Sequence, residues 1–221
     1  MDLARINREA VHLWHKLTGE KARARKAAFA SFDAAVAALR PGDLAIDLGA
    51  NAGLFTEPMA QTGADVVAFE PDPHAFGLLQ KRLGARANVT LIAAAAGAEA
   101  GQFHLYRHRD FQVEPDRRTT SSSLIAGKRN VDAAHAIAVE VKDFVAYLTD
   151  LNRDVALLKI DIEGAEVALL ERLLADPVSG RIGHIFVETH ERMLPDLALR
   201  TQTLKAKAKG RATPVINWDW H

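Results

Sequence analysis

The sequence contains no cysteine, and this absence excludes several kinds of site. Without thiols the chain cannot form disulfides, bind zinc through thiolates or use a cysteine nucleophile. It also lacks an apolar run of the roughly 18 residues that a membrane span needs. Residues 1–32 lack the apolar core of a secretory signal, so we expect a cytoplasmic protein.

The chain also has no net charge, because 28 basic residues balance 28 acidic ones. A neutral chain has no global field that attracts nucleic acid or an anionic membrane, so neither is an expected partner. Hydrophobic residues make up 48% of the sequence and charged residues 25%, as in ordinary globular proteins. With 221 residues, the chain can form one domain with a full core, or a core domain with a small appendage.

Short apolar runs alternate with helical patterns along most of the chain. The expected strands cover 44–50, 65–71, 89–97, 155–164, 182–190 and 213–218. The expected helices among them cover roughly 53–62, 74–85 and 165–175, with another after Pro195. Strands that are apolar on both faces and alternate with helices indicate a doubly wound α/β fold, with a mostly parallel sheet covered on both sides.

The same patterns predict two regions. Residues 1–40 read as an N-terminal helical extension, which ends at the breaker Arg-Pro-Gly-Asp, and residues 41–221 form the main domain. Within that domain, residues 98–150 form an insertion with a hairpin arm at 102–108.

Residues 109–130 of the insertion are polar and without pattern, so we expect a loop there. Loops of this length are usually functional or mobile. Ser122 and Ser123 lie in this segment, and we expect them to contact the substrate as part of a lid over it. The alternative is a plain flexible loop.

The run AIDLGANAGLFT has the form of a strand, a tight loop and a helix. Gly49 and Gly53 let the backbone turn sharply and bring its amides close to a ligand. A dinucleotide fingerprint would need glycine where the chain has Asn51 and Leu54, so that match fails. An acid at the strand end, Asp47, suits a ligand with a positive charge, such as an amino group or a sulfonium.

The second expected strand ends in FEP, which places Glu70 at its carboxyl end. An acidic side chain there can accept hydrogen bonds from both ribose hydroxyls. Together with Asp47, it predicts a nucleoside with an amino-acid tail, S-adenosylmethionine. The alternative is that both acids only cap the helices that follow them.

A second group of polar residues lies in the runs LLKIDIEG and IFVETH. Lys159, Asp161 and Glu163 alternate, so we expect their side chains on one side of a strand. Glu188 and His190 alternate in the same way on the next strand. Because open α/β sheets bind ligands at the carboxyl ends of their strands, the four residues from Asp161 onward are expected to converge there.

Methyl transfer from S-adenosylmethionine needs alignment of the acceptor with the methyl group and a base for the acceptor's proton. His190 has the usual pKa closest to neutral, and Asp161 is the alternative if neighbouring carboxylates raise its pKa. Asp161, Glu188 and His190 could also bind Mg²⁺ or another hard cation, although no metal is expected.

Three further charged residues in this region have simpler expectations. Lys159 is expected to contact the substrate, or else to bridge a carboxylate across the sheet. Glu166 and Glu171 are expected on the solvent face of the helix that follows.

The order of these motifs resembles the FkbM-type methyltransferases from Gly42 to His190, through the runs AIDLGANAGLFT, VVAFEPDPHAFGLL, SSSL, LLKIDIEGAEVALLERL and FVETH. The Lys-x-Asp-x-Glu-Gly-x-Glu run is the most specific of them. The resemblance implies a class I, Rossmann-like, S-adenosylmethionine-dependent O-methyltransferase. Its acceptor would be a hydroxyl on a small molecule or a sugar-containing metabolite.

Carried onto this chain, the resemblance implies a methionine-side loop, a ribose acid and an adenine site near the end of the third strand. These are Asp47, Gly49, Asn51 and Gly53 for the loop, Glu70 for the ribose, and Ala95 and Ala96 for the adenine. Two alternatives remain open: a nucleotide-dependent oxidoreductase on a similar fold, and a non-catalytic methyltransferase-like binding protein. The sequence makes no prediction of oligomeric state.

Overall fold

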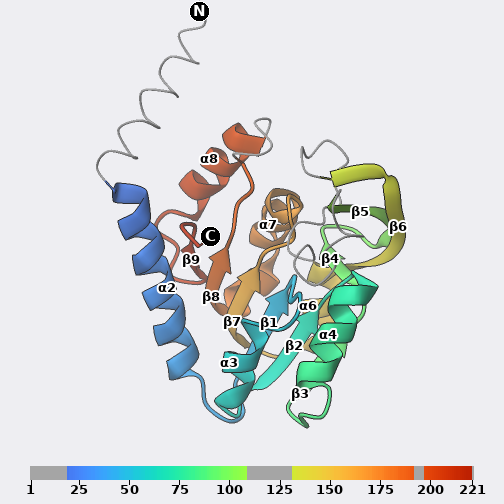
Figure 1. Cartoon of the computed structure of the whole chain (residues 1–221). Helices are drawn as coiled ribbons and strands as arrows, with labels where there is room; N and C mark the ends of the chain where they lie inside the picture. The colour runs from blue at the N-terminus through green and yellow to red at the C-terminus, as the bar shows by residue number, and fades with distance from the viewer. Residues whose placement is uncertain (1–18, 109–130, 192–196, 221) are drawn as a thin grey trace, which may run out of the picture.

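The computed structural model describes residues 19–108, 131–191 and 197–220 (Figure 1). Its main sheet has six strands, and every pairing between neighbours is parallel. Their order across the sheet is β3 (Val89–Ile92), β2 (Asp65–Phe69), β1 (Leu44–Leu48), β7 (Val155–Ile160), β8 (Ile182–Val187) and β9 (Val215–Asn217). The arrows of β1, β7 and β8 therefore point to one edge.

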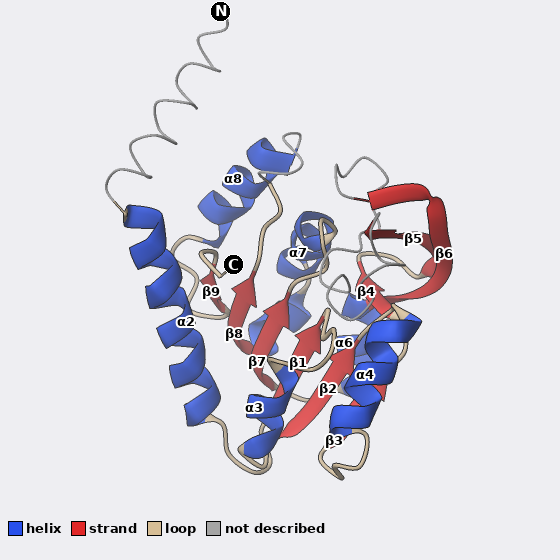
Figure 2. Cartoon of the chain, viewed as in Figure 1, coloured by secondary structure: helices blue, strands red, loops and turns tan. Residues whose placement is uncertain are grey.

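Helices cover both faces of this sheet, which confirms the doubly wound α/β fold (Figure 2). One layer contains α2 (Glu20–Ala38), α3 (Thr56–Gln61) and α4 (Pro73–Leu83). The other contains α6 (Phe144–Leu151), α7 (Glu166–Ala175), the 3-10 helix η2 (Pro177–Arg181) and α8 (Leu197–Ala208). No helix in the described part of the chain is long and apolar enough to cross a membrane.

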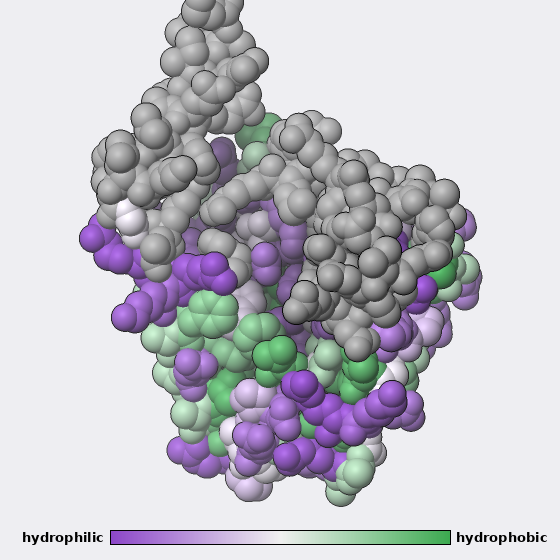
Figure 3. All heavy atoms as spheres, viewed as in Figure 1, coloured by the Kyte–Doolittle hydropathy of each residue, from purple (hydrophilic) through white to green (hydrophobic). Residues whose placement is uncertain are grey.

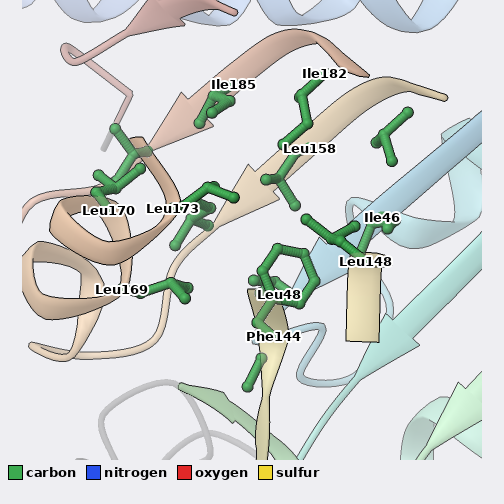
Figure 4. Close-up of a cluster of buried hydrophobic side chains, with 14 of the residues drawn as sticks. Ile46, Leu48, Phe144, Leu148, Leu158, Leu169, Leu170, Leu173, Ile182 and Ile185 are labelled. Carbon is green, nitrogen blue, oxygen red and sulfur yellow. The ribbon is translucent and has the colours of Figure 1, made fainter. Parts of the chain in front are cut away.

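The largest apolar cluster lies between the sheet and the layer of α6 and α7 (Figure 4). Leu158 on β7 faces this layer, where the side chains of Leu148 and Leu173 are buried. Burying a leucine side chain fully contributes about 1.5–3 kcal/mol. On the opposite face, Phe32 of α2 packs edge to face on Phe186 of β8, so α2 is part of that layer.

The expected strand over 89–97 is wrong as a single element. The chain forms β3 in the main sheet and then β4 (Ala95–Gly97) in a separate three-stranded sheet. In this second sheet, β4 pairs in parallel with β6 (Val131–Asp143), and β5 (Gly101–His108) pairs antiparallel with β6. The small sheet lies beside the carboxyl edge of the main one (Figure 1). The hairpin arm expected at 102–108 corresponds to β5.

The expected strand over 155–164 is also too long. β7 ends at Ile160, and Glu163 and Gly164 take positive φ angles of 59° and 117°. A turn with such angles cannot continue a strand, so the strand alternation stops before Glu163. Likewise β8 ends at Val187, before Glu188 and His190. Residues 1–18 and residues 109–130, where a loop with Ser122 and Ser123 was expected, lie outside the described residues.

Candidate active site

A pocket of about 310 Å³ opens at the carboxyl edge of the sheet, beside β1 and β7. β1 and β7 are where the strand order reverses, which is the place where open α/β sheets bind ligands. The volume of the pocket is at the lower end of the range for small-molecule sites. The lining residues come from five segments: 49–52 and 54–55, 70–71, 95–96, 105, and 159 with 161–163.

The loop after β1 lies directly against the turn after β7. At Gly49, with φ of 79°, an added Cβ would lie 1.8 Å from the backbone oxygen of Asp161. Only glycine permits this approach. Next in the loop, Asn51 takes a φ of 49° and its backbone N–H donates to Oε2 of Glu70 at 2.8 Å. The predicted loop residues Gly49 and Asn51 thus line the pocket.

Gly53 has another role in this loop. It is buried, with φ of 85°, and an added Cβ would lie 2.8 Å from Cδ1 of Leu79 on α4. Its bare backbone therefore lets the loop pack against α4, and it is not among the pocket-lining residues. Leu54, the next residue, lines the pocket and is 66% exposed.

Asp47 lies behind the pocket lining, with no exposed surface. Its Oδ1 accepts a hydrogen bond from Nζ of Lys159 at 3.0 Å, and its Oδ2 accepts one from the hydroxyl of Thr56 at 2.7 Å. Asp47 and Lys159 are register partners on β1 and β7, so the pair bridges the sheet. This is the alternative that the sequence left open for Lys159.

Lys159 also donates to the backbone oxygen of Gly49 at 3.0 Å, and its Nζ lies 3.9 Å from Oδ2 of Asp161. Burial alone would lower the pKa of Lys159, but the charges of Asp47 and Asp161 raise it above its usual value. The buried ammonium thus supports both loops that border the pocket. Its bonds to Asp47 and Gly49 suit support of the loop better than contact with a substrate.

Glu70, the acid expected to bind the ribose, follows β2 and lines the pocket, although it is only 6% exposed. Its Oε2 accepts the N–H of Asn51, and its Oε1 accepts the N–H of Asp72 at 2.8 Å. Burial raises the pKa of Glu70 to about 7, against the opposing effect of these two backbone donors. Each carboxylate oxygen can accept a further hydrogen bond, so the group can still bind a hydroxyl pair.

The neighbouring acid, Asp72, begins α4 and has a partner from the second sheet. Its side chain accepts the backbone N–H groups of His74 and Ala75, and Arg107 of β5 binds it in a bidentate pair at 2.7 and 3.0 Å. Arg107 therefore ties the insertion hairpin to the loop that carries Glu70.

Asp161 follows β7, lines the pocket, and its side chain is 27% exposed. Burial raises its pKa to about 7, with Glu188 and Glu163 adding to the shift and Lys159 and His190 opposing it. A carboxylate with a pKa near neutrality can accept a proton at physiological pH. Glu188 lies nearby at 32% exposure, and burial likewise raises its pKa.

His190 lies between two carboxylates, at 8% exposure. Its Nδ1 is 2.9 Å from Oε1 of Glu166, its Nε2 is 3.1 Å from Oε2 of Glu163, and Oε1 of Glu188 is 3.9 Å away. Burial alone would lower the pKa of His190, but the bonds to Glu163 and Glu166 and their charges raise it to about 11. A protonated ring cannot accept a proton, so the expectation that His190 is the base finds no support in this geometry.

Glu166 is the residue that the sequence interpretation misplaced. It was expected on the solvent face of its helix but is fully buried, whereas Glu171 is at the surface in a pair with Arg200. The available signal was its place in the first turn of α7, two residues after Gly164, where an acid can accept free backbone N–H groups.

No metal was expected, and the three residues named as a possible metal set are not the three that come together. Among the described residues, the side chains close enough to share an ion are Asp161, Glu166 and His190, whose ligand atoms lie within 4.8 Å of one another. Glu188 is not in this group. Both ring nitrogens of His190 lie within hydrogen-bond distance of carboxylate oxygens, so a cation bound at the ring would have to replace a ring proton.

Part of the pocket lining is apolar. Figure 3 shows hydrophobic residues gathered in the middle of one face, with hydrophilic residues around them. Ala95 and Ala96 of β4, expected near the adenine, are nearly buried and line the pocket together with Leu105 of β5. With the exposed Leu54, they form the apolar part of the pocket lining, here called the apolar wall.

A parallel, doubly wound sheet with a glycine loop after β1, an acid after β2 and a pocket between them defines a Rossmann-like fold of the methyltransferase type. Comparison with family models agrees, because residues 47–206 match the model of the Methyltransferase FkbM domain. The chain belongs to the FkbM methyltransferase family.

Relatives with this similarity include two proteins matched over most of their length. "Methyltransferase 1" of Beauveria bassiana is 27% identical over 190 residues, which cover 79% of this chain and 74% of that protein. "31-O-demethyl-FK506 methyltransferase FkbM" of Streptomyces tacrolimicus is 27% identical over 176 residues, covering 69% of this chain and 67% of that protein.

A third relative matches over a shorter stretch but with a higher sequence identity. "Ribosomal RNA small subunit methyltransferase A" of Thermotoga neapolitana is 46% identical over 53 residues, 24% of this chain. The matched region spans only 20% of that protein's length. A search of solved structures found no significant match.

Proposed function

We propose that the protein is an S-adenosylmethionine-dependent O-methyltransferase that acts on a hydroxyl of a small molecule or sugar-containing metabolite. The observation that carries the proposal is the position of Asp161. This carboxylate, whose pKa burial raises to about 7, lies in the same pocket as the glycine loop and Glu70. Methyl transfer to an alcohol needs both a cofactor site and a base in one cavity.

The pocket residues fit this cofactor in three respects. Glu70 offers carboxylate oxygens at the end of β2, where a ribose is bound in related folds. The Gly49–Asn51 loop exposes backbone at the pocket wall, and the apolar wall with Ala95, Ala96 and Leu105 suits a flat adenine ring. The acids beyond the loop suit the cationic sulfonium.

When bound, S-adenosylmethionine would supply the methyl group. Asp161 would accept the proton of the acceptor hydroxyl, and Lys159, 3.9 Å from its Oδ2, would hold the carboxylate in place. The turn after β7 would align the acceptor, because its residues Asp161 and Glu163 both line the pocket. The name of the Streptomyces relative, which refers to an oxygen of FK506, supports transfer to oxygen.

Membership of a methyltransferase family counts against the oxidoreductase alternative, as does the failed dinucleotide fingerprint. No observation of the described residues specifically favours a non-catalytic binding protein. The acidic pocket with a near-neutral carboxylate is the arrangement that catalysis needs.

The test is calorimetric titration with S-adenosylhomocysteine, the demethylated product. We expect the wild-type protein to bind it and Glu70→Ala to bind at least about tenfold more weakly, since one good hydrogen bond to a charged group contributes about 1.5–3 kcal/mol. Glu140→Ala, which removes an exposed glutamate paired with Lys142 on β6, is the matched control and should bind normally. Absence of wild-type binding at millimolar ligand would refute the proposed function.

A further inference from the structure

Two buried charged side chains, Glu166 and His190, lie next to the pocket without lining it. Glu166 begins α7, and His190 follows β8 by three residues. Both touch the turn formed by residues 161–164, which delivers Asp161 and Glu163 to the pocket. Their contacts with this turn suggest what they do.

The turn has a backbone conformation that needs support. Glu163 has a φ of 59°, a region that costs free energy for a residue with a side chain. The Glu166 carboxylate accepts the N–H of Ile162 at 3.0 Å, and each of its oxygens lies 3.0 Å from the N–H of Gly164. One buried carboxylate thus binds the backbone on both sides of the strained residue.

His190 adds a second attachment. Its Nδ1 lies 2.9 Å from Oε1 of Glu166, and its Nε2 lies 3.1 Å from Oε2 of Glu163. If both carboxylates are ionised, they only accept hydrogen bonds, so both ring nitrogens donate and the ring is positively charged. The imidazolium therefore joins the turn after β7 to the segment after β8.

The charges around the ring are consistent with this role. Asp161 and Glu163 face it from the turn, Glu166 from α7 and Glu188 from the segment after β8. The other cation of the site, Lys159, contacts Asp161 from β7. Without His190, the carboxylates of the turn would repel one another across a poorly solvated space.

We propose that Glu166 and His190 are positioning residues: the Glu163–His190–Glu166 bridge fixes the 161–164 turn and so sets where Asp161 and Glu163 stand in the pocket. In this arrangement the positive charge of the imidazolium neutralises the surrounding acids, as a metal ion could. His190 is therefore neither the base nor a metal ligand. The catalytic meaning of the turn rests on the proposed function, whereas the bridge itself does not.

The first experiment follows the ring nitrogens of His190 by ¹⁵N NMR of the wild-type protein between pH 6 and 9.5, with His190→Gln used to assign its signals. We expect both nitrogens to remain protonated at pH 9, while exposed histidines with pKa near 6.5 have become neutral. A neutral His190 ring at pH 8 would overturn the proposal. Addition of MgCl₂ should leave the signals unchanged, and a metal-induced shift with loss of the ring proton would also overturn it.

The second experiment compares Glu166→Gln with Glu171→Gln, a matched substitution on the exposed face of the same helix. Glu166→Gln should speed amide hydrogen exchange at Ile162 and Gly164 at least about tenfold, because the amide binds their N–H groups less strongly than a carboxylate. Glu171→Gln should leave it unchanged. Equal exchange in the two variants would refute the bridge.

The deciding readout is the titration of Asp161, because a neutral histidine with a merely structural role would not affect it. In His190→Gln, the apparent pKa of the Asp161 carboxyl, followed by ¹³C NMR, should rise by about half a unit or more because a nearby cation is lost. S-adenosylhomocysteine affinity should stay within about threefold of wild type. An unmoved Asp161 titration would refute the positioning role, whereas absence of wild-type cofactor binding would refute only the proposed function.

Discussion

Replacing Lys159 with methionine should lower the free energy of unfolding by about 3–5 kcal/mol, because it leaves a buried carboxylate without its cation. The Lys159 and Asp47 side chains are 2% and 0% exposed, and their charged atoms lie 3.0 Å apart. Methionine matches the length of the aliphatic stem, so the substitution creates little empty space. Of the contacts described for Asp47, the variant retains the hydroxyl of Thr56.

The size of this loss depends on pH in a predictable direction. The charge of Lys159 lowers the pKa of Asp161 and of Glu70, so its removal should raise both pKa values further. An acid whose folded-state pKa is raised loses stability as pH rises, so the difference from wild type should grow from pH 5 to pH 7.

Urea unfolding at both pH values, followed by the fluorescence of the buried Trp220, measures this difference. The double variant Asp47→Asn/Lys159→Met removes both charges and should recover at least half of the loss. A loss below about 1 kcal/mol at pH 7, or a double variant no more stable than the single one, would contradict the assignment of a buried ion pair.

Three further predictions concern the pocket and the hairpin. Asp161→Asn should lower turnover by about 10²–10⁴-fold with normal S-adenosylhomocysteine affinity, and wild-type turnover should rise with pH through about 7, where the Asp161 carboxyl loses its proton. Gly49→Ala, whose Cβ would lie 1.8 Å from the Asp161 backbone oxygen, should abolish cofactor binding in calorimetry; normal affinity would place the ligand elsewhere. Arg107→Ala strips the buried Asp72 of its bidentate partner and should cost about 1–3 kcal/mol in urea unfolding. The control is Arg153→Ala, which removes an exposed ion pair with Asp65 and should lower the free energy of unfolding by less than about 1 kcal/mol.

The main sheet was predictable because parallel strands that are buried on both faces have continuous apolar sequences, with helical patterns between them. The runs at 44–50 and 65–71 contain β1 and β2, and those at 155–164 and 182–190 contain β7 and β8. The alanine-rich run at 89–97 could not be divided by the same reasoning. Where β3 ends and β4 begins depends on pairing with β6, a segment distant in sequence.

The position of a site residue was predictable where the residue directly follows a strand. Glu70 and Asp161 each follow a strand and line the pocket. Asp47 is the opposite case, because its partner across the sheet, Lys159, is set by strand register that the sequence does not show. The positive φ at Glu163 was likewise hidden, since a glutamate gives no sign of a left-handed turn.

Two cations hold this acid-rich site together from different sides. Lys159 on β7 bonds Asp47 on β1 and the oxygen of Gly49, so it joins the loop after β1 to the central strands. His190 joins the turn after β7 to the segment after β8. Asp161 lies between them, 3.9 Å from Nζ of Lys159 and lowered in pKa by both charges. Burial and the neighbouring acids raise the pKa of Asp161, so its value near 7 results from opposing effects. Removal of either cation should therefore raise this pKa further.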